Sequence, residues 1–228
     1  MIRVAVAGAA GRMGRTVCEA VQGAEDMRLT GRADPLLDTA LADVLEQAEV
    51  VVDFTRPDTA LENALQCLRA GVHVVVGTTG FDPAPLEQAA RERDAAGAPR
   101  ANVLIAPNFA IGAVLMMRFA TEAARHMAKA EIVELHHDGK LDAPSGTAAL
   151  TAQLMAQATG GEPPPIHSVR LPGLIASQEV ILGDRAQTLT IRHDTTGRES
   201  FMPGVLLAIR RVGALERSPT VGLEQLLF

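Results

Sequence analysis

Residues 134–148 hold the densest group of reactive side chains in this sequence of 228 residues. They read Glu-Leu-His-His-Asp-Gly-Lys-Leu-Asp-Ala-Pro-Ser-Gly-Thr-Ala, so two adjacent histidines, a lysine and two aspartates lead into a Ser-Gly-Thr sequence. Histidine titrates near neutral pH, and a lysine amine with a lowered pKa releases a proton there, which a guanidinium does not. Of the 21 basic residues, only Lys129 and Lys140 are lysines. The segment therefore predicts proton-transfer chemistry that involves the histidines and Lys140.

The end of the same segment predicts the start of a helix. Residues 148–157 are almost all good helix formers, which indicates a helix from about Ser145 to Ala158. The N–H groups in the first turn of a helix have no partner inside the helix and can hold an anion. We therefore expect an anion site beside the proton-transfer groups.

The two histidines, His136 and His137, end a strand-like run at residues 131–137. Neighbouring residues of a strand point to opposite faces, so both histidines serve one ligand only if the strand ends there. The Asp138-Gly139 pair is a turn signal that permits this ending.

A metal site is an alternative use of these side chains. His136 and His137 with Asp138 or Asp142 would supply the ligands. Consecutive ligands suit one metal ion poorly, and the neighbouring lysine adds repulsion. We therefore expect no metal.

A second group of small residues lies near the start of the chain. Gly8-Ala9-Ala10-Gly11-Arg12-Met13-Gly14 follows a strand-like run and opens a helical pattern. Its GxxGxxG spacing is a variant of the Rossmann fingerprint, which lets the backbone approach a pyrophosphate. Asp34 comes twenty residues after Gly14, where a ribose-binding carboxylate belongs. These residues predict a dinucleotide site.

Two further loops follow strand-like runs and are expected on the same edge of the sheet, where ligands bind. They contain Gly77, Thr78 and Thr79, and Ala106, Pro107, Asn108 and Phe109.

The residues near Asp34 favour NADH as the cofactor. Its carboxylate would meet the 2′-phosphate of NADPH, and Pro35 stands where an arginine could pair with that phosphate. Arg12 and Arg32 are near enough in sequence to compensate, so NADPH is expected to be usable as well.

The pattern of apolar runs predicts an α/β protein with two domains. Strand-like and helical runs alternate in the first half, which is typical of a Rossmann-like, doubly wound parallel sheet. A smaller α+β domain with a mixed sheet is expected to follow, opened by a helix at residues 111–128. We predict a dinucleotide-binding domain at 1–107 that a C-terminal helix in 203–228 completes, and a substrate-binding and oligomerisation domain at 108–202. The strand-like runs of the first half are Arg3–Ala7, Arg28–Ala33, Val50–Phe54, Val72–Val76 and Val103–Ala106.

Composition narrows the classes of partner. The formal net charge of −6 argues against nucleic acid, and no apolar run has the ~18 residues that a membrane span needs. Cys18 and Cys67 lack metal or redox spacing and are expected to be buried thiols. The N-terminus shows no secretory signal pattern, so we expect a cytoplasmic protein.

Three segments together resemble the 4-hydroxy-tetrahydrodipicolinate reductase (dihydrodipicolinate reductase) family of lysine and diaminopimelate biosynthesis. They are residues 6–14, Asp53-Phe54-Thr55 with Gly77-Thr78-Thr79-Gly80-Phe81, and residues 134–148. The resemblance implies an oxidoreductase whose Rossmann domain binds a nicotinamide cofactor. It also implies that the C-terminal domain binds a dicarboxylate and forms a homotetramer.

The resemblance also assigns roles by position. His136 and Lys140 match the catalytic pair, and His137, Gly146 and Thr147 match the substrate contacts. Cofactor contacts match Gly8 to Met13, Asp34, Gly77 to Thr79 and Ala106 to Phe109.

The sequence departs from the family pattern in two places. The chain is shorter than many members, with the loss placed between Asp34 and Val50, and Ser177 stands where a histidine is expected.

The chemistry that the resemblance implies is transfer of a hydride to C4 of a cyclic imine and of a proton elsewhere. Lys140 or His136 would deliver the proton, and the residues leave that choice open. Asp138 and Asp142 are expected to hold one of them in place or to cap the helix. For Arg170, Arg192 and Arg198, surface solvation is favoured over pairing with a carboxylate.

Two other classes of function remain. One is another two-domain dehydrogenase of an amino-acid-derived substrate, such as aspartate dehydrogenase. The other is a non-catalytic NAD-binding sensor, against which the His136 and Lys140 pair argues, because binding alone requires no proton donor.

Overall fold

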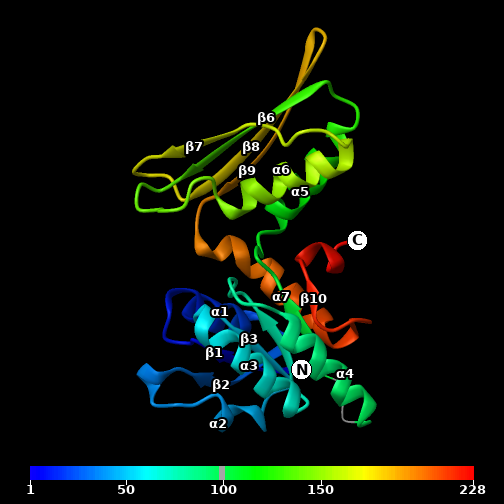
Figure 1. Cartoon of the computed structure of the whole chain (residues 1–228). Coiled ribbons are helices and arrows are strands. Elements are labelled where there is room, and N and C mark those ends of the chain that lie inside the picture. Colours follow the sequence, from blue (N-terminus) through cyan, green and yellow to red (C-terminus); the bar gives the residue numbers. More distant parts are fainter. Residues whose placement is uncertain (98–100) are drawn as a thin grey trace. The chain divides into compact units, whose positions relative to one another are not determined.

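The computed structural model describes residues 1–97 and 101–228. The chain divides into two compact units, one of Met1–Phe109 with Phe201–Phe228 and one of Ala110–Ser200 (Figure 1). The sequence placed these boundaries after residue 107 and before residue 203, two residues away in each case.

Parallel strands form the centre of the first unit. Within the described residues its sheet has the order β10-β5-β4-β3-β1-β2, and every pair of neighbours is parallel. This is the doubly wound parallel sheet that the sequence predicted. The strands are β1 (Ile2–Ala7), β2 (Met27–Ala33), β3 (Val50–Asp53), β4 (His73–Val76), β5 (Val103–Ile105) and β10 (Thr220–Val221).

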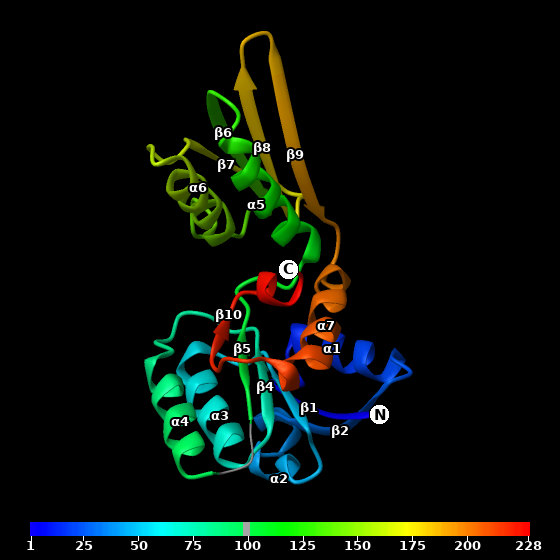
Figure 2. The same ribbon diagram turned by 90° about the vertical axis from the view of Figure 1, so that its right-hand side faces the viewer.

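Helices cover both faces of this sheet. Figure 2 shows α1 and α7 on one face and α3 and α4 on the other. Strands covered on both sides need apolar residues throughout, and the valines at 50–52 and 74–76 are buried accordingly. The helices of this unit are α1 (Arg12–Gly23), α2 (Ala42–Leu45), α3 (Pro57–Arg69), α4 (Ala84–Ala95) and α7 (Met202–Arg211).

The strand order reverses at β1, which lies between β2 and β3. After β1 the chain continues to β2 on one side of β1, and after β3 it continues to β4 in the opposite direction. The loops that follow β1 and β3 therefore diverge and leave a crevice between them. This crevice is where the residues of the glycine-rich segment begin.

The second unit pairs a mixed sheet with two helices. Its four strands have the order β7-β6-β8-β9, with β6 and β7 parallel and the other neighbours antiparallel. The mixed sheet of the predicted α+β domain is confirmed. Its elements are α5 (Ile111–Ala124), β6 (Lys129–His136), α6 (Gly146–Thr159), β7 (Ile166–Arg170), β8 (Ala176–Asp184) and β9 (Gln187–Thr195).

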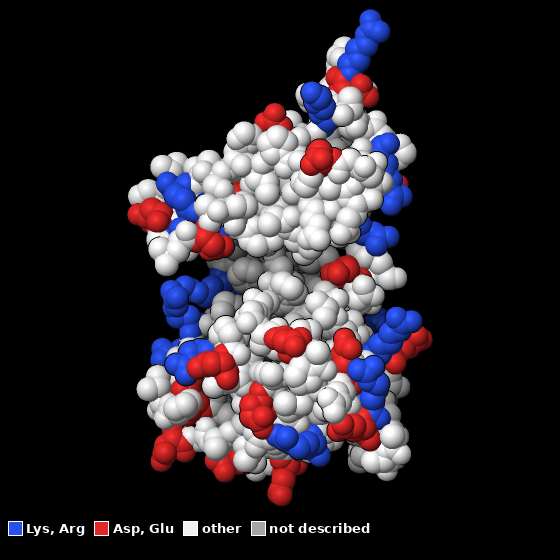
Figure 3. Space-filling view, in the orientation of Figure 1, with Lys and Arg blue, Asp and Glu red and all other residues white. Residues whose placement is uncertain are grey.

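Both helices of this unit pack on one face of the sheet (Figure 1). Ile132, Val180 and Leu182 point to that face and are fully buried. The helix α6 contains no charged residue, and Figure 3 shows the surface over it as largely uncharged. Small and apolar side chains therefore attach α6 to the sheet.

One predicted element was wrong in extent. The helix expected at residues 111–128 ends at Ala124, because the residues from Lys129 onward pair with β8. The final helix, expected at about residues 203–212 within the segment 203–228, is α7, and after it the chain forms the two-residue strand β10 beside β5, which was not predicted. A strand of two residues is too short to show a period in the sequence.

Candidate active site

The turn between β1 and α1 is shaped by contacts that only glycine permits. Gly8 has a φ of 75°, and a Cβ there would lie 2.7 Å from the carbonyl oxygen of Phe54. A Cβ on Gly14 would collide with the carbonyl oxygen of Gly8. Gly11 is the N-cap of α1 and offers no capping side chain, so the first N–H groups of this helix are available to an anion. The turn thus has the form of a pyrophosphate cradle.

Asp34 connects this turn to the loop after β2. Its Oδ2 accepts a hydrogen bond from the N–H of Ala10 (3.0 Å), and its Oδ1 accepts one from Leu36 N–H (2.9 Å). Each carboxylate oxygen can accept a second hydrogen bond, so Asp34 can still accept hydrogen bonds from ribose hydroxyls.

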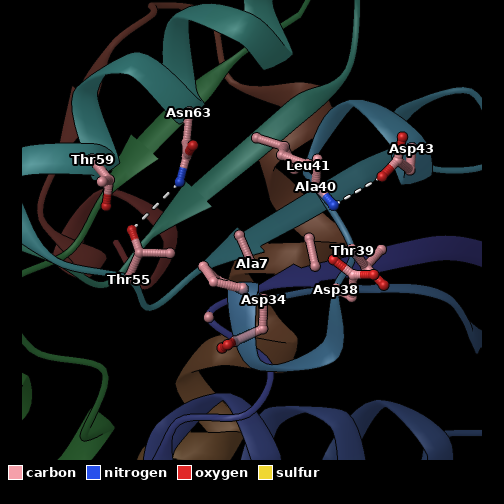
Figure 4. A pocket seen from close by; sticks show the side chains of 13 residues that line it. Ala7, Asp34, Asp38, Thr39, Ala40, Leu41, Asp43, Thr55, Thr59 and Asn63 are labelled. Carbon is pink, nitrogen blue, oxygen red and sulfur yellow. Dashed lines mark hydrogen bonds between the residues drawn. The ribbon is translucent and has the colours of Figure 1, made fainter.

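A pocket of about 580 Å³ opens beside Asp34 (Figure 4). Three carboxylates, of Asp34, Asp38 and Asp43, are among the thirteen described residues that line it, and none of the thirteen is lysine or arginine. Gly8 from the glycine-rich turn lines it as well. The pocket is therefore acidic where it meets the predicted cofactor turn.

The opposite wall of this pocket was missed by the sequence analysis. It consists of Thr55, Thr59 and Asn63, which follow β3. The signal that could have found them is the strand order, since β3 lies directly beside β1 at the point of reversal.

A buried carboxylate organises the loop after β3. Asp53 accepts hydrogen bonds from the N–H (2.9 Å) and hydroxyl (2.6 Å) of Thr55 and from Asn63 Nδ2 (2.7 Å). Burial raises the pKa of Asp53, although these hydrogen bonds oppose the shift. The hydroxyl of Thr78 donates to the carbonyl of Thr55 (3.0 Å), so it is engaged in joining the loops after β3 and β4.

The other predicted cofactor loops gather around Phe54. A Cβ on Gly77 would collide with the Phe54 ring, and the rings of Phe54 and Phe109 lie 5.7 Å apart. The loops of residues 77–79 and 106–109 therefore follow neighbouring strands on one edge of the sheet, but they do not line the acidic pocket.

In the second unit, β6 ends at His136, as the turn signal permitted. The N–H of Lys140 donates to the carbonyl of His137 (3.1 Å) and closes the turn that follows. His137 is exposed, whereas the side chain of His136 is only 15% exposed.

A carboxylate that the sequence analysis gave no role, Glu134, lies behind His136. It is completely buried, and its Oε2 lies 2.5 Å from His136 Nδ1. Arg170 donates from Nη1 and Nη2 to the two carboxylate oxygens, each at 2.8 Å, and Ser145 N–H donates to Oε1 (3.2 Å). Burial would raise the pKa of Glu134, but hydrogen bonds from Arg170, Ser168 and His136 outweigh it and lower the pKa to about 2.

The pKa of His136 is lowered from its ordinary value. Burial is the main cause, and the charges of Lys140 and Arg170 act in the same direction against the opposing effect of Glu134. These effects favour the neutral imidazole of His136.

Lys140 and Asp142 form an ion pair on the loop after β6. The Lys140 Nζ donates to both carboxylate oxygens, at 2.7 and 2.8 Å, and this pairing lowers the pKa of Asp142. Of the uses expected for Asp142, holding the lysine is the one that the structure shows.

The helix α6 begins as predicted. Ser145 is its N-cap and accepts a hydrogen bond from Ala148 N–H (3.2 Å), and Gly146 and Thr147 form the first turn. Glu134 connects the strand end to this helix start, and Arg170, which binds Glu134, connects both to the lysine loop at the carbonyl of Asp142.

The expectation of surface solvation was wrong for Arg170. Arg170 lies on β7 beside His136 in register, with 19% of its side chain exposed, and pairs with Glu134. Arg192 is more exposed and pairs with Glu179 and Asp194. Sequence offered no signal for Arg170, because its partner is 36 positions away.

The described residues contain no group of three or more histidine, cysteine or acidic side chains placed to hold a metal ion. Within the same residues, no helix is both long and apolar enough to cross a membrane.

Comparison with known proteins gives one family over both units. Residues 2–109 match the family model described as "Dihydrodipicolinate reductase, N-terminus", and residues 112–227 match "Dihydrodipicolinate reductase, C-terminus". A relative from Mycolicibacterium smegmatis, named 4-hydroxy-tetrahydrodipicolinate reductase, is 48% identical over 246 residues and covers 99% of both chains. One of the same name from Thermobifida fusca is 48% identical over 249 residues, covering 100% of this chain and 99% of its own.

Solved structures agree. The "Dipicolinate bound Dihydrodipicolinate reductase from Paenisporosarcina sp. TG-14" has a TM-score of 0.84 and 37% identity over 99% of both chains. A probable dehydrogenase from Thermotoga maritima shares only the fold, with a TM-score of 0.61 and 12% identity over 99% of this chain and 92% of its own.

Proposed function

The chain belongs to the dihydrodipicolinate reductase family, and on that basis we propose that it reduces 4-hydroxy-tetrahydrodipicolinate to tetrahydrodipicolinate with NAD(P)H. This reaction belongs to lysine and diaminopimelate biosynthesis. The observation that carries the proposal is the convergence of His136, the Lys140 loop and the start of α6 on the ion pair of Glu134 and Arg170. Glu134 contacts His136 and Ser145 N–H, and Arg170 contacts the carbonyl of Asp142 in the loop. A solved relative described as dipicolinate-bound supports a small dicarboxylate as the ligand.

The first unit supplies residues that fit a nicotinamide dinucleotide. The glycine turn at 8–14 is tight, because a Cβ at Gly8 or Gly14 would collide with backbone atoms, and the N–H groups at its helix start would bind the pyrophosphate. Asp34 would accept hydrogen bonds from the hydroxyls of the adenosine ribose. The loops at 77–79 and 106–109 would contact the rest of the cofactor.

We favour NADH over NADPH as the cofactor. Asp34, Asp38 and Asp43 line the adenosine-side pocket without a lysine or arginine among its described lining residues. The 2′-phosphate of NADPH would add negative charge beside these carboxylates, which raises its binding free energy. We expect the Michaelis constant for NADH to be lower than that for NADPH, and a large advantage of NADPH would contradict this preference.

In the second unit, each predicted residue has a distinct task. Gly146 and Thr147 at the start of α6, with His137, would hold the carboxylates of the substrate. The bound cofactor supplies the hydride that adds to C4. Lys140 or His136 supplies the proton that completes the reduction, and a positioned acid of this kind typically contributes ~10²–10⁴-fold to the rate.

We also propose a homotetramer. The sheet face of the second unit opposite α5 and α6 presents Val133, Leu135 and Ile181 in half-buried positions without a covering helix among the described residues. Light scattering of the purified protein measures the assembly, and a monomer would contradict it.

The deciding experiment couples the protein to a synthase that forms the substrate from pyruvate and aspartate semialdehyde. The fall in NADH absorbance reports the reduction. We expect oxidation that depends on both the protein and the synthase, and no oxidation at high protein concentration would refute the proposed function.

A further inference from the structure

The buried carboxylate of Glu134 is costly to maintain. A buried ion pair seldom stabilises a fold more than apolar side chains of the same volume would. The Nε–H of Arg170 adds to the cost, because it is buried and has no hydrogen-bond partner among the described residues. Stability alone therefore gives little reason for this pair, and its contacts indicate what else it does.

Arg170 holds the loop that carries the lysine. In addition to Glu134, it donates from Nη2 to the carbonyl oxygen of Asp142 (2.7 Å) and from Nη1 to that of Val169 (2.7 Å). The Asp142 side chain in turn binds Lys140. One guanidinium thus fixes both the carboxylate behind His136 and the backbone beside Lys140.

The hydrogen bond between Glu134 and His136 determines which ring nitrogen carries the proton. An ionised carboxylate only accepts hydrogen bonds, so Nδ1 of His136 must be the donor. A neutral imidazole has one N–H group, which leaves Nε2 with a lone pair on the far side of the ring.

We propose that Glu134 and Arg170 are positioning residues that hold His136 as the neutral tautomer protonated on Nδ1, so that Nε2 presents a lone pair to the reaction. The proposal rests on the proposed function. In this form His136 accepts a hydrogen bond through Nε2, whereas the other tautomer would present an N–H group there instead.

The charges around His136 agree with this assignment. Glu134 lies on the same strand, Arg170 on the neighbouring strand β7, and Lys140 with Asp142 on the following loop. Because Arg170 binds both oxygens of Glu134, the carboxylate does not draw a second proton onto His136, and the lowered pKa of His136 has the same direction.

The chain offers a matched pair of variants for the test. In Glu134→Gln the amide can donate to Nδ1, which moves the ring proton to Nε2. The control is Glu131→Gln, because Glu131 binds His167 (2.8 Å) across the same two strands in an exposed position. We expect kcat to fall by ~10²-fold or more for Glu134→Gln, with the NADH dissociation constant within about twofold of wild type, and Glu131→Gln to be unchanged. A wild-type kcat for Glu134→Gln overturns the proposal.

A pH profile separates positioning from a purely structural role. Arg170→Met leaves Glu134 unpaired beside His136, so the pKa of His136 rises and the acid limb of kcat/KM moves to higher pH. Arg170→Lys keeps the positive charge but loses the bidentate contact with Glu134. The acid limb of its kcat/KM profile should stay near that of wild type. An unmoved limb in Arg170→Met contradicts the proposal.

The wild-type protein provides a test that needs no variant to fold and no assay. Nitrogen NMR with labelled histidine distinguishes the two tautomers and the imidazolium near neutral pH. We expect protonated Nδ1 and bare Nε2 for His136, and the reverse tautomer or the imidazolium overturns the assignment. If the wild type fails the coupled assay, the proposed function falls, while this measurement still reports the tautomer.

Discussion

The Lys140 ammonium is held by Asp142 in a loop whose side chains are otherwise exposed. Its substitution in Lys140→Ala removes one of the two groups proposed to supply the proton, so we expect kcat to fall by ~10²–10⁴-fold. NADH binding should change little, because the predicted cofactor contacts belong to the first unit. Steady-state kinetics measures the first effect and NADH fluorescence the second, since the chain has neither tryptophan nor tyrosine.

The other lysine of the chain serves as the control. Lys129 is exposed at the start of β6, so Lys129→Ala removes a lysine charge at the end of this strand remote from the Lys140 loop. It should retain wild-type kinetics. Loss of NADH binding in Lys140→Ala would show that the role of this residue had been misplaced.

At this scale the sequence predicted the residues that are contiguous and chemically unusual. His136, Lys140, Gly146 and their neighbours lie within one segment, and the structure brings them to one strand end and one helix start. Glu134 and Arg170 could not be paired in advance, because the register of β6 against β7 determines their contact and no local pattern encodes that register.

At the scale of elements, the junction of β1 and α1 depends on the approach of two backbone segments. Gly14→Ala would drive a methyl group into the carbonyl of Gly8, so we expect the turn to shift and NADH affinity to fall by ~10-fold or more. Titration of NADH fluorescence measures the loss.

The same helix contains the control substitution. A Cβ on Gly23, the last residue of α1, meets no atom within 4 Å. Gly23→Ala should therefore keep NADH affinity, with a free energy of unfolding unchanged or raised by up to ~1 kcal/mol. Equal losses in both variants would mean that the helix as a whole, and not the close approach, determines binding.

Element boundaries were predicted where apolar runs are long and end at turn residues. The five longer strands of the first unit meet this condition. The helix α5 did not end where its pattern ended, because the alanines and Met127 after Ala124 suit a helix as well as a strand. Pairing of Lys129 with Gly183 of β8 decides the outcome, and such a contact is invisible to local propensity.

At the scale of the whole molecule, the chain returns to the first unit after residue 200 and completes its sheet with β10. Leu223, 1% exposed, packs against α7 at Gly204 just after this strand. We expect Leu223→Ala to lower the free energy of unfolding by ~2–5 kcal/mol, because it leaves a cavity in the core. Urea unfolding measures the change.

An exposed leucine of the same unit provides the comparison. Leu36 is 83% exposed, and Leu36→Ala should change the free energy of unfolding by no more than ~0.5 kcal/mol. If Leu223→Ala behaves in the same way, the final segment does not contribute to the core of the first unit.

The fold class was predictable, because alternating apolar strands and amphipathic helices allow few arrangements. Of the three carboxylates of the acidic pocket, only Asp34 was predicted. Asp38 ends a short 3-10 turn in a left-handed conformation with a φ of 50°, and Asp43 lies in the four-residue helix α2, which is too short to show a period.

The double attachment of Asp34 has a consequence for attempts to redesign the cofactor preference. The side chain that would discriminate against NADPH is also the acceptor for the N–H groups of Ala10 and Leu36. Replacing Asp34 with arginine, to bind the 2′-phosphate of NADPH, would also remove the hydrogen-bond acceptors of these two N–H groups. The same side chain therefore determines both cofactor selectivity and the geometry of the turn. A change of preference to NADPH requires a second substitution that supplies the missing acceptors.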